Sequence, residues 1–257
     1  MQLEVQNISF SYVPSREVFH GISFSLEEGE CLSILGANGA GKSTLLNCLA
    51  GLLTPRTGQI LLDGRPVRSY SRREIARLIG YVPQIHDSSF AYTVLEFVVM
   101  GRTPYIPPYG RPSREDYRIA AANLERIGMA GMEQAIYTEL SGGEQQLCMI
   151  ARVLTQEAKI ILLDEPTNHL DFGNQYRTVE RIRSLAHAHY TILSTTHNPD
   201  HAFMLGGKAA ILDRDGSLML GPAEEILTAE RLSKLYGIPI GISHSPEAGR
   251  RICFAKT

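Results

Sequence analysis

A short apolar run and the glycine-rich loop after it place the strongest constraint on the fold of this 257-residue chain. The run 31–35 (CLSIL) suits a strand buried on both faces, as in a parallel sheet covered by helices. The loop 36–43 (GANGAGKS) fits the pattern GxxxxGK(S/T). Leucines with helical spacing follow within 43–53, namely Leu45, Leu46, Leu49 and Leu52. Strand, glycine loop and helix in this order predict an α/β domain whose first helix begins at a phosphate-binding loop.

The loop 36–43 has the residue types that hold a nucleoside triphosphate. Its glycines let consecutive backbone N–H groups curl around phosphate oxygens without Cβ clashes, and the helix N-terminus adds partial positive charge. We expect Lys42 to bind the β- and γ-phosphates and the hydroxyl of Ser43 to reach Mg²⁺. The residues expected to contact the nucleotide here are Asn38, Gly39, Ala40, Gly41, Lys42, Ser43 and Thr44.

Two acidic residues follow a second buried strand, which is predicted at 160–163. Asp164, at the end of this strand, is placed to hold Mg²⁺, and Glu165 is placed to polarise the attacking water. A phosphate-binding loop followed about 120 residues later by such a pair predicts hydrolysis of the nucleotide. Lys42 and Glu165 are therefore candidate catalytic residues.

The middle of the chain changes from β to helical periodicity. Thr93 and Glu96 make a capping box at the start of a short helix. Prolines interrupt residues 102–112, which excludes regular structure there. A helix restarts at Ser113, and Gly128 is its expected stop.

The remaining segments complete an α/β pattern. Alternating apolar residues predict antiparallel strands before residue 27, with a change of phase near Asn7. A helix is expected from 142 to about 156, a strand at 191–194 and a hairpin at 208–220. We therefore expect one domain, 1–257, with an α/β core at about 1–91 and 157–257 and an inserted helical subdomain at about 92–156.

Composition and charge exclude several classes of protein. Hydrophobic residues make up 44% and charged residues 20%, which argues against disorder. The formal net charge of -2 gives no bulk attraction to nucleic acid or anionic lipid. The four cysteines include no CxxC pair, so buried free thiols in a reducing compartment are expected. With no secretory signal and no apolar stretch of about 18 residues, we expect a cytosolic chain that does not span a membrane.

Residues 140–145 (LSGGEQ) supply a second phosphate-binding helix terminus, built from Ser141, Gly142 and Gly143. One nucleotide does not need two such termini from one chain. With this segment about twenty residues before the strand at 160–163, the sequence resembles the ATP-binding cassette (ABC) proteins over nearly its whole length. The resemblance implies a P-loop NTPase core, in which helices flank a mixed sheet beside an N-terminal antiparallel β part, plus the inserted α-helical subdomain. It also implies a homodimer that sandwiches two ATP molecules head to tail.

The resemblance assigns further roles to single residues. Tyr12 occupies the place of the aromatic that stacks on adenine, and Gln84 that of the glutamine contacting Mg²⁺ and the attacking water. Asp171 belongs to the loop that crosses the dimer interface, and His197 matches the histidine that holds the γ-phosphate. Ser43, Gln84 and Asp164 are then the expected Mg²⁺ residues. The other histidines are expected in loops or at the surface: His20, His86, His169, His187, His189, His201 and His244.

The resemblance extends to importers of iron–siderophores, haem and vitamin B12, through the segments 89–105, 166–171 and 227–239. It implies a peripheral subunit at the cytoplasmic face of the membrane, bound to permease subunits and served by a separate substrate-binding protein. In that family the first part of the insert forms a groove for a short permease helix. The run Thr195-Thr196-His197 also occurs in importers of molybdate or tungstate, which remain an alternative. An iron–sulfur assembly ATPase is a second alternative, and no nucleic-acid partner is expected.

Overall fold

A six-stranded sheet forms the centre of the computed structural model, which describes residues 2–84 and 91–256. Its strand order is β10-β9-β3-β8-β7-β6. All neighbours pair in parallel except β9 and β10, which form the predicted antiparallel hairpin. The sheet is therefore mixed, as expected. The strands are β3 (Cys31–Gly36), β6 (Ile79–Val82), β7 (Ile160–Leu163), β8 (Thr191–Thr196), β9 (Lys208–Leu212) and β10 (Leu218–Pro222).

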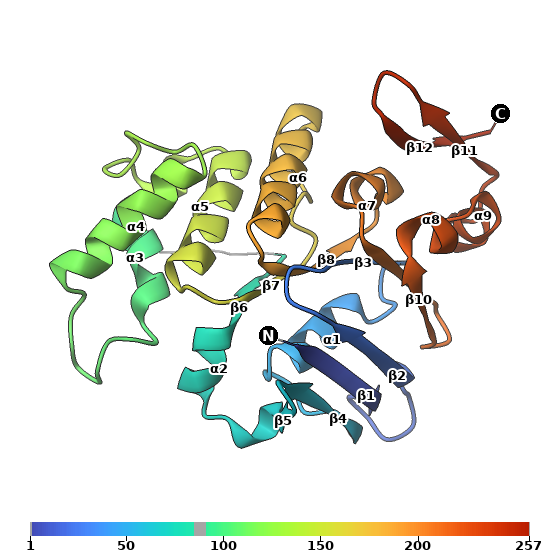
Figure 1. The fold of residues 1–257 in the computed structure, drawn as a ribbon, viewed down its shortest axis with the longest axis horizontal. Helices are drawn as coiled ribbons and strands as arrows, with labels where there is room; N and C mark the ends of the chain where they lie inside the picture. The colour runs from blue at the N-terminus through green and yellow to red at the C-terminus, as the bar shows by residue number, and fades with distance from the viewer. Residues whose placement is uncertain (1, 85–90, 257) are drawn as a thin grey trace.

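A second, antiparallel sheet of four strands lies below the first in Figure 1. Its order is β2-β1-β4-β5, and β1 shifts its register against both neighbours after residue 5 or 6. Asn7 has a φ of +50°, so the chain bulges where the apolar alternation changes phase. This confirms the predicted N-terminal β part. The strands are β1 (Leu3–Phe10), β2 (Phe19–Leu26), β4 (Thr57–Leu62) and β5 (Arg65–Pro66).

Helix α1 (Lys42–Leu49) packs between the two sheets, and its leucines 45, 46 and 49 join one buried cluster with both. The helix is shorter than the predicted 43–53. Gly51 has a φ of +69°, which ends the helix and turns Leu52 to the surface, where it is 64% exposed. The expectation that Leu52 belongs to this helix is wrong, because the chain turns away at Gly51 and helical spacing has meaning only within the helix.

The opposite face of the six-stranded sheet is covered by α5 (Gly142–Thr155) and α6 (Phe172–His187). Strand β7 is buried throughout, and its side chains alternate between the two faces. Ile160 and Leu162 pack on the α1 side, whereas Ile161 and Leu163 pack on the α5 and α6 side. The continuous apolar run was thus correctly interpreted as a strand covered on both faces.

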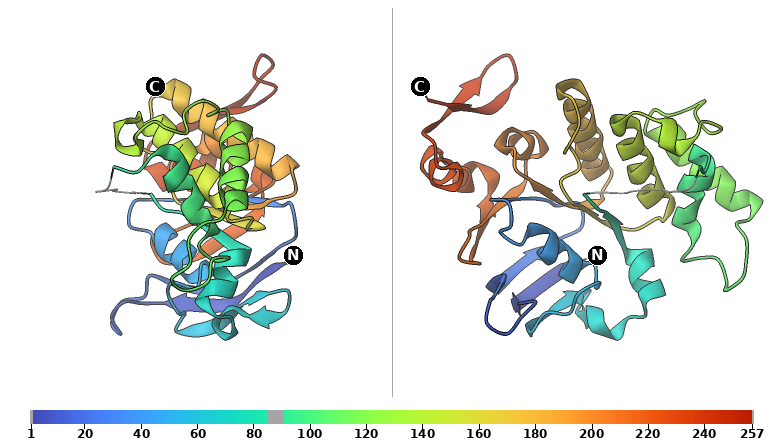
Figure 2. Two further views of the ribbon diagram at one scale, coloured as in Figure 1. Left: turned by 90° about the vertical axis from the view of Figure 1, so that its left-hand side faces the viewer. Right: turned by 180° about the vertical axis from the view of Figure 1, so that it is seen from behind.

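Helices α3 (Val94–Val99), α4 (Arg114–Arg126) and α5 gather beside β6 at one end of the sheet (Figure 2). The predicted capping box at Thr93 forms, the helix predicted to restart at Ser113 begins there with a capping box of its own, and Gly128 ends α4 with a φ of +82°. The limits 92 and 156 of a helical subdomain remain a prediction. Three short 3-10 turns and one further helix lie in this half of the chain: Val67–Ser69, Met100–Arg102, Tyr137–Glu139 and α2 (Arg72–Leu78).

The last part of the chain folds beside β9 and β10 around a third apolar cluster. Its hairpin of β11 and β12 is anchored to α6 and α7, because Arg250 Nη2 donates to Tyr176 Oη at 2.9 Å and the Cys253 amide donates to Asp200 Oδ1 at 2.9 Å. Cys253 is only half-buried, unlike the other three cysteines, which corrects the expectation for it. The elements are α7 (Pro199–Leu205), α8 (Ala223–Ile226), α9 (Ala229–Tyr236), β11 (Ile240–Ser245) and β12 (Arg250–Ala255). Over residues 2–84 and 91–256, every helix is too short or too polar to cross a membrane.

Candidate active site

The candidate residues follow four adjacent parallel strands and therefore lie at one edge of the sheet. The loop after β3 ends in Lys42, β8 is followed by His197, β7 by Asp164 and Glu165, and β6 by Gln84. Because all four strands are parallel, their carboxyl ends open at the same edge, where α/β proteins bind ligands. The cleft there has a volume of about 1180 Å³ and is lined by residues 36–44, Gln84, Glu165 and His197, among others.

Lys42 is buried at the start of α1. Its Nζ donates to the carbonyl oxygen of Gly36 at 2.9 Å and lies 3.1 Å from Glu165 Oε1. Gly41, just before it, has a φ of +102°, and a Cβ there would lie 2.5 Å from Val18. Only glycine fits this approach, so the loop geometry that positions Lys42 depends on residue 41.

Glu165 contacts four other side chains of the cleft, namely Lys42, Gln84, Asn168 and His197. Its Oε2 accepts from Asn168 Nδ2 at 3.2 Å, from His197 Nδ1 at 3.4 Å and from Gln84 Nε2 at 3.5 Å. The hydrogen bond from His197, followed by the charge of Lys42, lowers the pKa of Glu165 to about 2 despite its burial. At neutral pH this group is therefore a carboxylate facing a cation and three hydrogen-bond donors.

Thr195 holds the two acidic residues in place. Its Oγ1 donates to Asp164 Oδ1 at 2.7 Å and accepts from the Glu165 amide at 2.8 Å. The Asp164 side chain is 2% exposed, and its other oxygen accepts from Tyr81 Oη at 3.4 Å. Glu165 has a φ of +48°, a conformation that costs roughly 1–3 kcal/mol for a residue with a side chain. The hydrogen bond to Thr195 stabilises this turn, which directs the carboxylate towards Lys42.

Tyr12 reaches the cleft from the segment after β1. Its hydroxyl lies 3.1 Å from Thr44 Oγ1, the residue is 64% exposed, and its ring stands nearly perpendicular to that of Phe10. Asn38, Gly39, Ala40, Ser43 and Thr44 line the same cleft. An exposed aromatic ring beside a phosphate-binding loop is suited to stack on a planar base.

The model of the ABC transporter family matches residues 19–168, which is more than half of the chain. This chain belongs to the ABC transporter family. One of its relatives is the molybdate import ATP-binding protein MolC of Haemophilus influenzae, at 36% identity over 93% of this chain and 89% of that protein. Another is the hemin import ATP-binding protein HmuV of Nocardia farcinica, at 34% identity over 93% of this chain and 82% of that protein.

A solved structure gives the same result for the fold. It is described as an inward-facing conformation of a putative metal-chelate type ABC transporter, and one of its chains matches with a TM-score of 0.86 and 34% identity. The match covers 98% of this chain and 95% of that one. The predicted P-loop NTPase fold is confirmed, and the protein is an ABC-type ATPase.

The remaining expected site residues of this ABC ATPase lie outside the cleft around Lys42. Ser141 caps α5, and its amide donates to Glu144 Oε2 at 2.9 Å. Asp171 caps α6, where its Oδ1 accepts from the Asn174 amide at 2.9 Å. Neither these residues nor Gly142 and Gly143 belong to the described lining of the cleft. One chain of the ABC ATPase therefore gathers the residues around Lys42 but not the LSGGEQ segment.

The structure of the ABC ATPase adds residues that sequence reasoning missed. Thr195 and Asn168 contact the acidic pair directly, and Tyr236 Oη donates to the carbonyl oxygen of His197 at 2.8 Å. Thr195 and Asn168 belong to segments that the family resemblance had already singled out. Only their contacts in the structure distinguish them from the neighbouring polar residues. Arg16, Arg214 and Leu235 also line the cleft.

For one histidine of the ABC ATPase, the location predicted from the sequence is wrong. His201 was expected in a loop or at the surface, but it lies in α7 and is 4% exposed. Its ring is enclosed between Thr167 and Asn198, which belong to the loops after β7 and β8. His86 lies outside the described residues.

Proposed function

We propose that this ATPase is a peripheral subunit at the cytoplasmic face of a membrane, where it powers an importer formed by separate permease subunits. The observation that carries the catalytic part is the cluster of Lys42, His197 and Glu165, backed by buried Asp164. In such hydrolysis the protein supplies position and charge, and the phosphoryl group passes to water.

Glu165 orients the attacking water in this proposal. Its low pKa keeps it ionised, and His197 and Gln84 border the same oxygen. Lys42 and His197 stabilise the charge of the γ-phosphate. ATP must then replace Glu165 as the partner of Lys42, which frees the carboxylate to hold water.

Ser43, Gln84 and Asp164 fit a Mg²⁺ site because hydroxyl, amide and carboxylate oxygens are the ligands that this hard cation prefers. Ser43 and Gln84 line the cleft, and Asp164 sits directly behind it. Bound Mg²⁺ would neutralise charge on the phosphates.

We propose a head-to-tail dimer for the complete site. Ser141 caps α5 and Gly142 and Gly143 begin it, away from their own cleft, so a partner chain would present these three residues to the γ-phosphate. Asp171, exposed at the start of α6, would cross the interface in the same dimer. Tyr12 would stack on the adenine.

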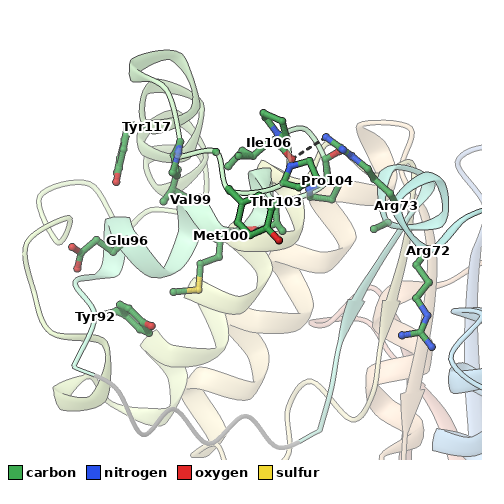
Figure 3. Close-up of a pocket in the computed structure, with 16 residues that line it drawn as sticks. Arg72, Arg73, Tyr92, Glu96, Val99, Met100, Thr103, Pro104, Ile106 and Tyr117 are labelled. Atoms are coloured by element: carbon green, nitrogen blue, oxygen red, sulfur yellow. Dashed lines mark hydrogen bonds between the residues drawn. The ribbon is translucent and has the colours of Figure 1, made fainter.

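A second hollow supports the permease as a partner. It has a volume of about 730 Å³ and lies between α2 and α3, with the loop 103–112 along one side (Figure 3). Val99 and Met100 supply apolar lining. Arg73 holds the loop in place, donating to the carbonyl oxygens of Pro104 at 2.7 Å and Ile106 at 2.9 Å. A groove of this shape suits a short amphipathic helix.

The transported solute is a metal chelate in this proposal. The similarity to a metal-chelate type transporter and to a hemin import protein supports it. The molybdate import relative, at 36% identity, supports an oxyanion as the second candidate. A separate substrate-binding protein would deliver either solute to the permease.

A capture experiment tests the assembly. The full chain carrying Glu165→Gln is incubated with ATP, Mg²⁺ and detergent-solubilised native membranes, and a polytopic membrane protein is expected to be retained. Adding Met100→Glu places a charge in the apolar groove and should abolish capture. Met219→Glu, a matched change at an exposed site on β10, should not. Capture of a soluble partner alone, or equal capture by both variants, contradicts the proposal.

A further inference from the structure

His201 forms a buried bridge between the two loops that follow β7 and β8. Its Nδ1 lies 3.2 Å from Thr167 Oγ1, and its Nε2 lies 3.2 Å from Asn198 Nδ2. Thr167 is buried as well. The ring does not line the nucleotide cleft, so it does not contact the reacting groups.

The amide of Asn198 determines which nitrogen of the ring carries the proton. Asn198 Oδ1 accepts from the Asp200 amide at 2.9 Å, so the amide nitrogen of the side chain faces His201 and can only donate. Nε2 must then accept, and the proton resides on Nδ1, which donates to Thr167 Oγ1. The ring is neutral: burial, with a further contribution from His197, lowers the pKa of His201 to about 4.

Both ends of this bridge adjoin residues that contact Glu165. Thr167 precedes Asn168, which donates to Glu165 Oε2, and Asn198 follows His197, which contacts the same oxygen. His197 itself is about half exposed on its side chain. The loop that carries His197 is held by the hydrogen bond from Tyr236 to the His197 carbonyl oxygen and by the hydrogen bond between Asn198 and His201.

We propose that His201 is a positioning residue for ATP hydrolysis: anchored on Thr167, it holds Asn198 and thereby keeps His197 aligned with Glu165. This inference rests on the roles proposed above for Glu165 and His197. A buried neutral imidazole that donates at one end and accepts at the other holds its two partners at a fixed separation. Neither hydrogen bond can reverse its direction without breaking. An apolar side chain of similar size would fill the space but leave both loops unlinked.

Two amide variants of the full chain separate the two bonds. In His201→Gln the carbonyl oxygen can take the place of Nε2 and accept from Asn198. In His201→Asn the amide nitrogen can take the place of Nδ1 and reach only Thr167. We expect His201→Asn, which loses the bond to Asn198, to lower kcat about tenfold, and His201→Phe, which loses both bonds, to lower it at least as much. ATP affinity should stay within about twofold, and His201→Gln should retain most of the wild-type kcat.

A double-mutant cycle with His197→Ala gives the second readout. If His201 acts through His197, adding His201→Asn to His197→Ala should lower kcat no further, although it lowers Tm in both backgrounds. Equal kcat for the Gln and Asn variants, no loss in either, or equal fold-losses in both backgrounds would each overturn the inference. Wild-type hydrolysis by His197→Ala alone would instead overturn the role proposed for His197, whatever the His201 variants do.

Discussion

Nζ of Lys42 lies 3.1 Å from Oε1 of Glu165, and the two side chains are 6% and 9% exposed. The loop after β3 and the end of β7 thus meet through an ion pair inside the cleft. In the proposed mechanism these groups have different partners during hydrolysis, Lys42 the phosphates and Glu165 the water. Binding of ATP should therefore exchange one contact of Lys42 for another.

Glu165→Gln should separate binding from hydrolysis. The neutral amide cannot polarise water as a carboxylate does, so hydrolysis should fall by roughly 10²–10⁴-fold. ATP affinity should be equal or higher, because Lys42 loses a competing anion. Size-exclusion chromatography with ATP and Mg²⁺ should show an accumulated dimer. Glu165→Asp is the control that retains the charge, and normal turnover by Glu165→Gln would remove this residue from its proposed role.

The Glu165 carboxylate should also stabilise the fold in a pH-dependent way. Its pKa falls from 4.5 to about 2 on folding, so the folded state favours the ionised form. This stabilisation is fully present above about pH 4.5 and is lost as the pH falls towards 2. The difference in free energy of unfolding between wild type and Glu165→Gln, measured by urea titration, should shrink across that window. A difference that stays constant from pH 6 to pH 3 would contradict it.

Thr195→Val should damage both acidic residues at once. Valine keeps the shape of threonine but leaves the Glu165 amide and one oxygen of Asp164 without the partner that Thr195 supplies. We expect the free energy of unfolding to fall by about 1–3 kcal/mol, together with a loss of ATPase activity. Thr195→Ser, which keeps the hydroxyl, is the matched control. A Val variant as stable and active as the Ser variant would show that these hydrogen bonds are dispensable.

Mixed dimers should reveal a composite site. Lys42→Ala removes the phosphate contact in cis, whereas Ser141→Arg blocks the segment that the partner is proposed to present. A purified heterodimer of the two variants should keep one intact site and hydrolyse ATP, although either homodimer is inactive. Two dead sites in this heterodimer would contradict the head-to-tail arrangement. The reference is a purified heterodimer of a wild-type chain and a chain with both substitutions, in which both sites should be inactive.

Local sequence patterns predicted much of this fold correctly. The apolar run 31–35, the loop 36–43, the capping box at Thr93 and the helix start at Ser113 each depend on neighbours only a few residues away. The same kind of signal was overlooked at Ser71 and Glu74, whose capping box begins α2. The C-terminal hairpin was also missed, because β11 and β12 lack a clean apolar alternation.

The sequence by itself determined which residues follow buried strands and therefore which chemistry the chain carries. Lys42, Asp164, Glu165 and His197 were all named from spacing or from family resemblance. Only the tertiary structure decided which of them touch. The strand order β3-β8-β7 is not the order along the chain, and it places the hydroxyl of Thr195 between Asp164 and the Glu165 amide. His201 shows the same limit: periodicity over one short helix does not reveal that its ring will be buried against Thr167, because burial is set by contacts between distant segments.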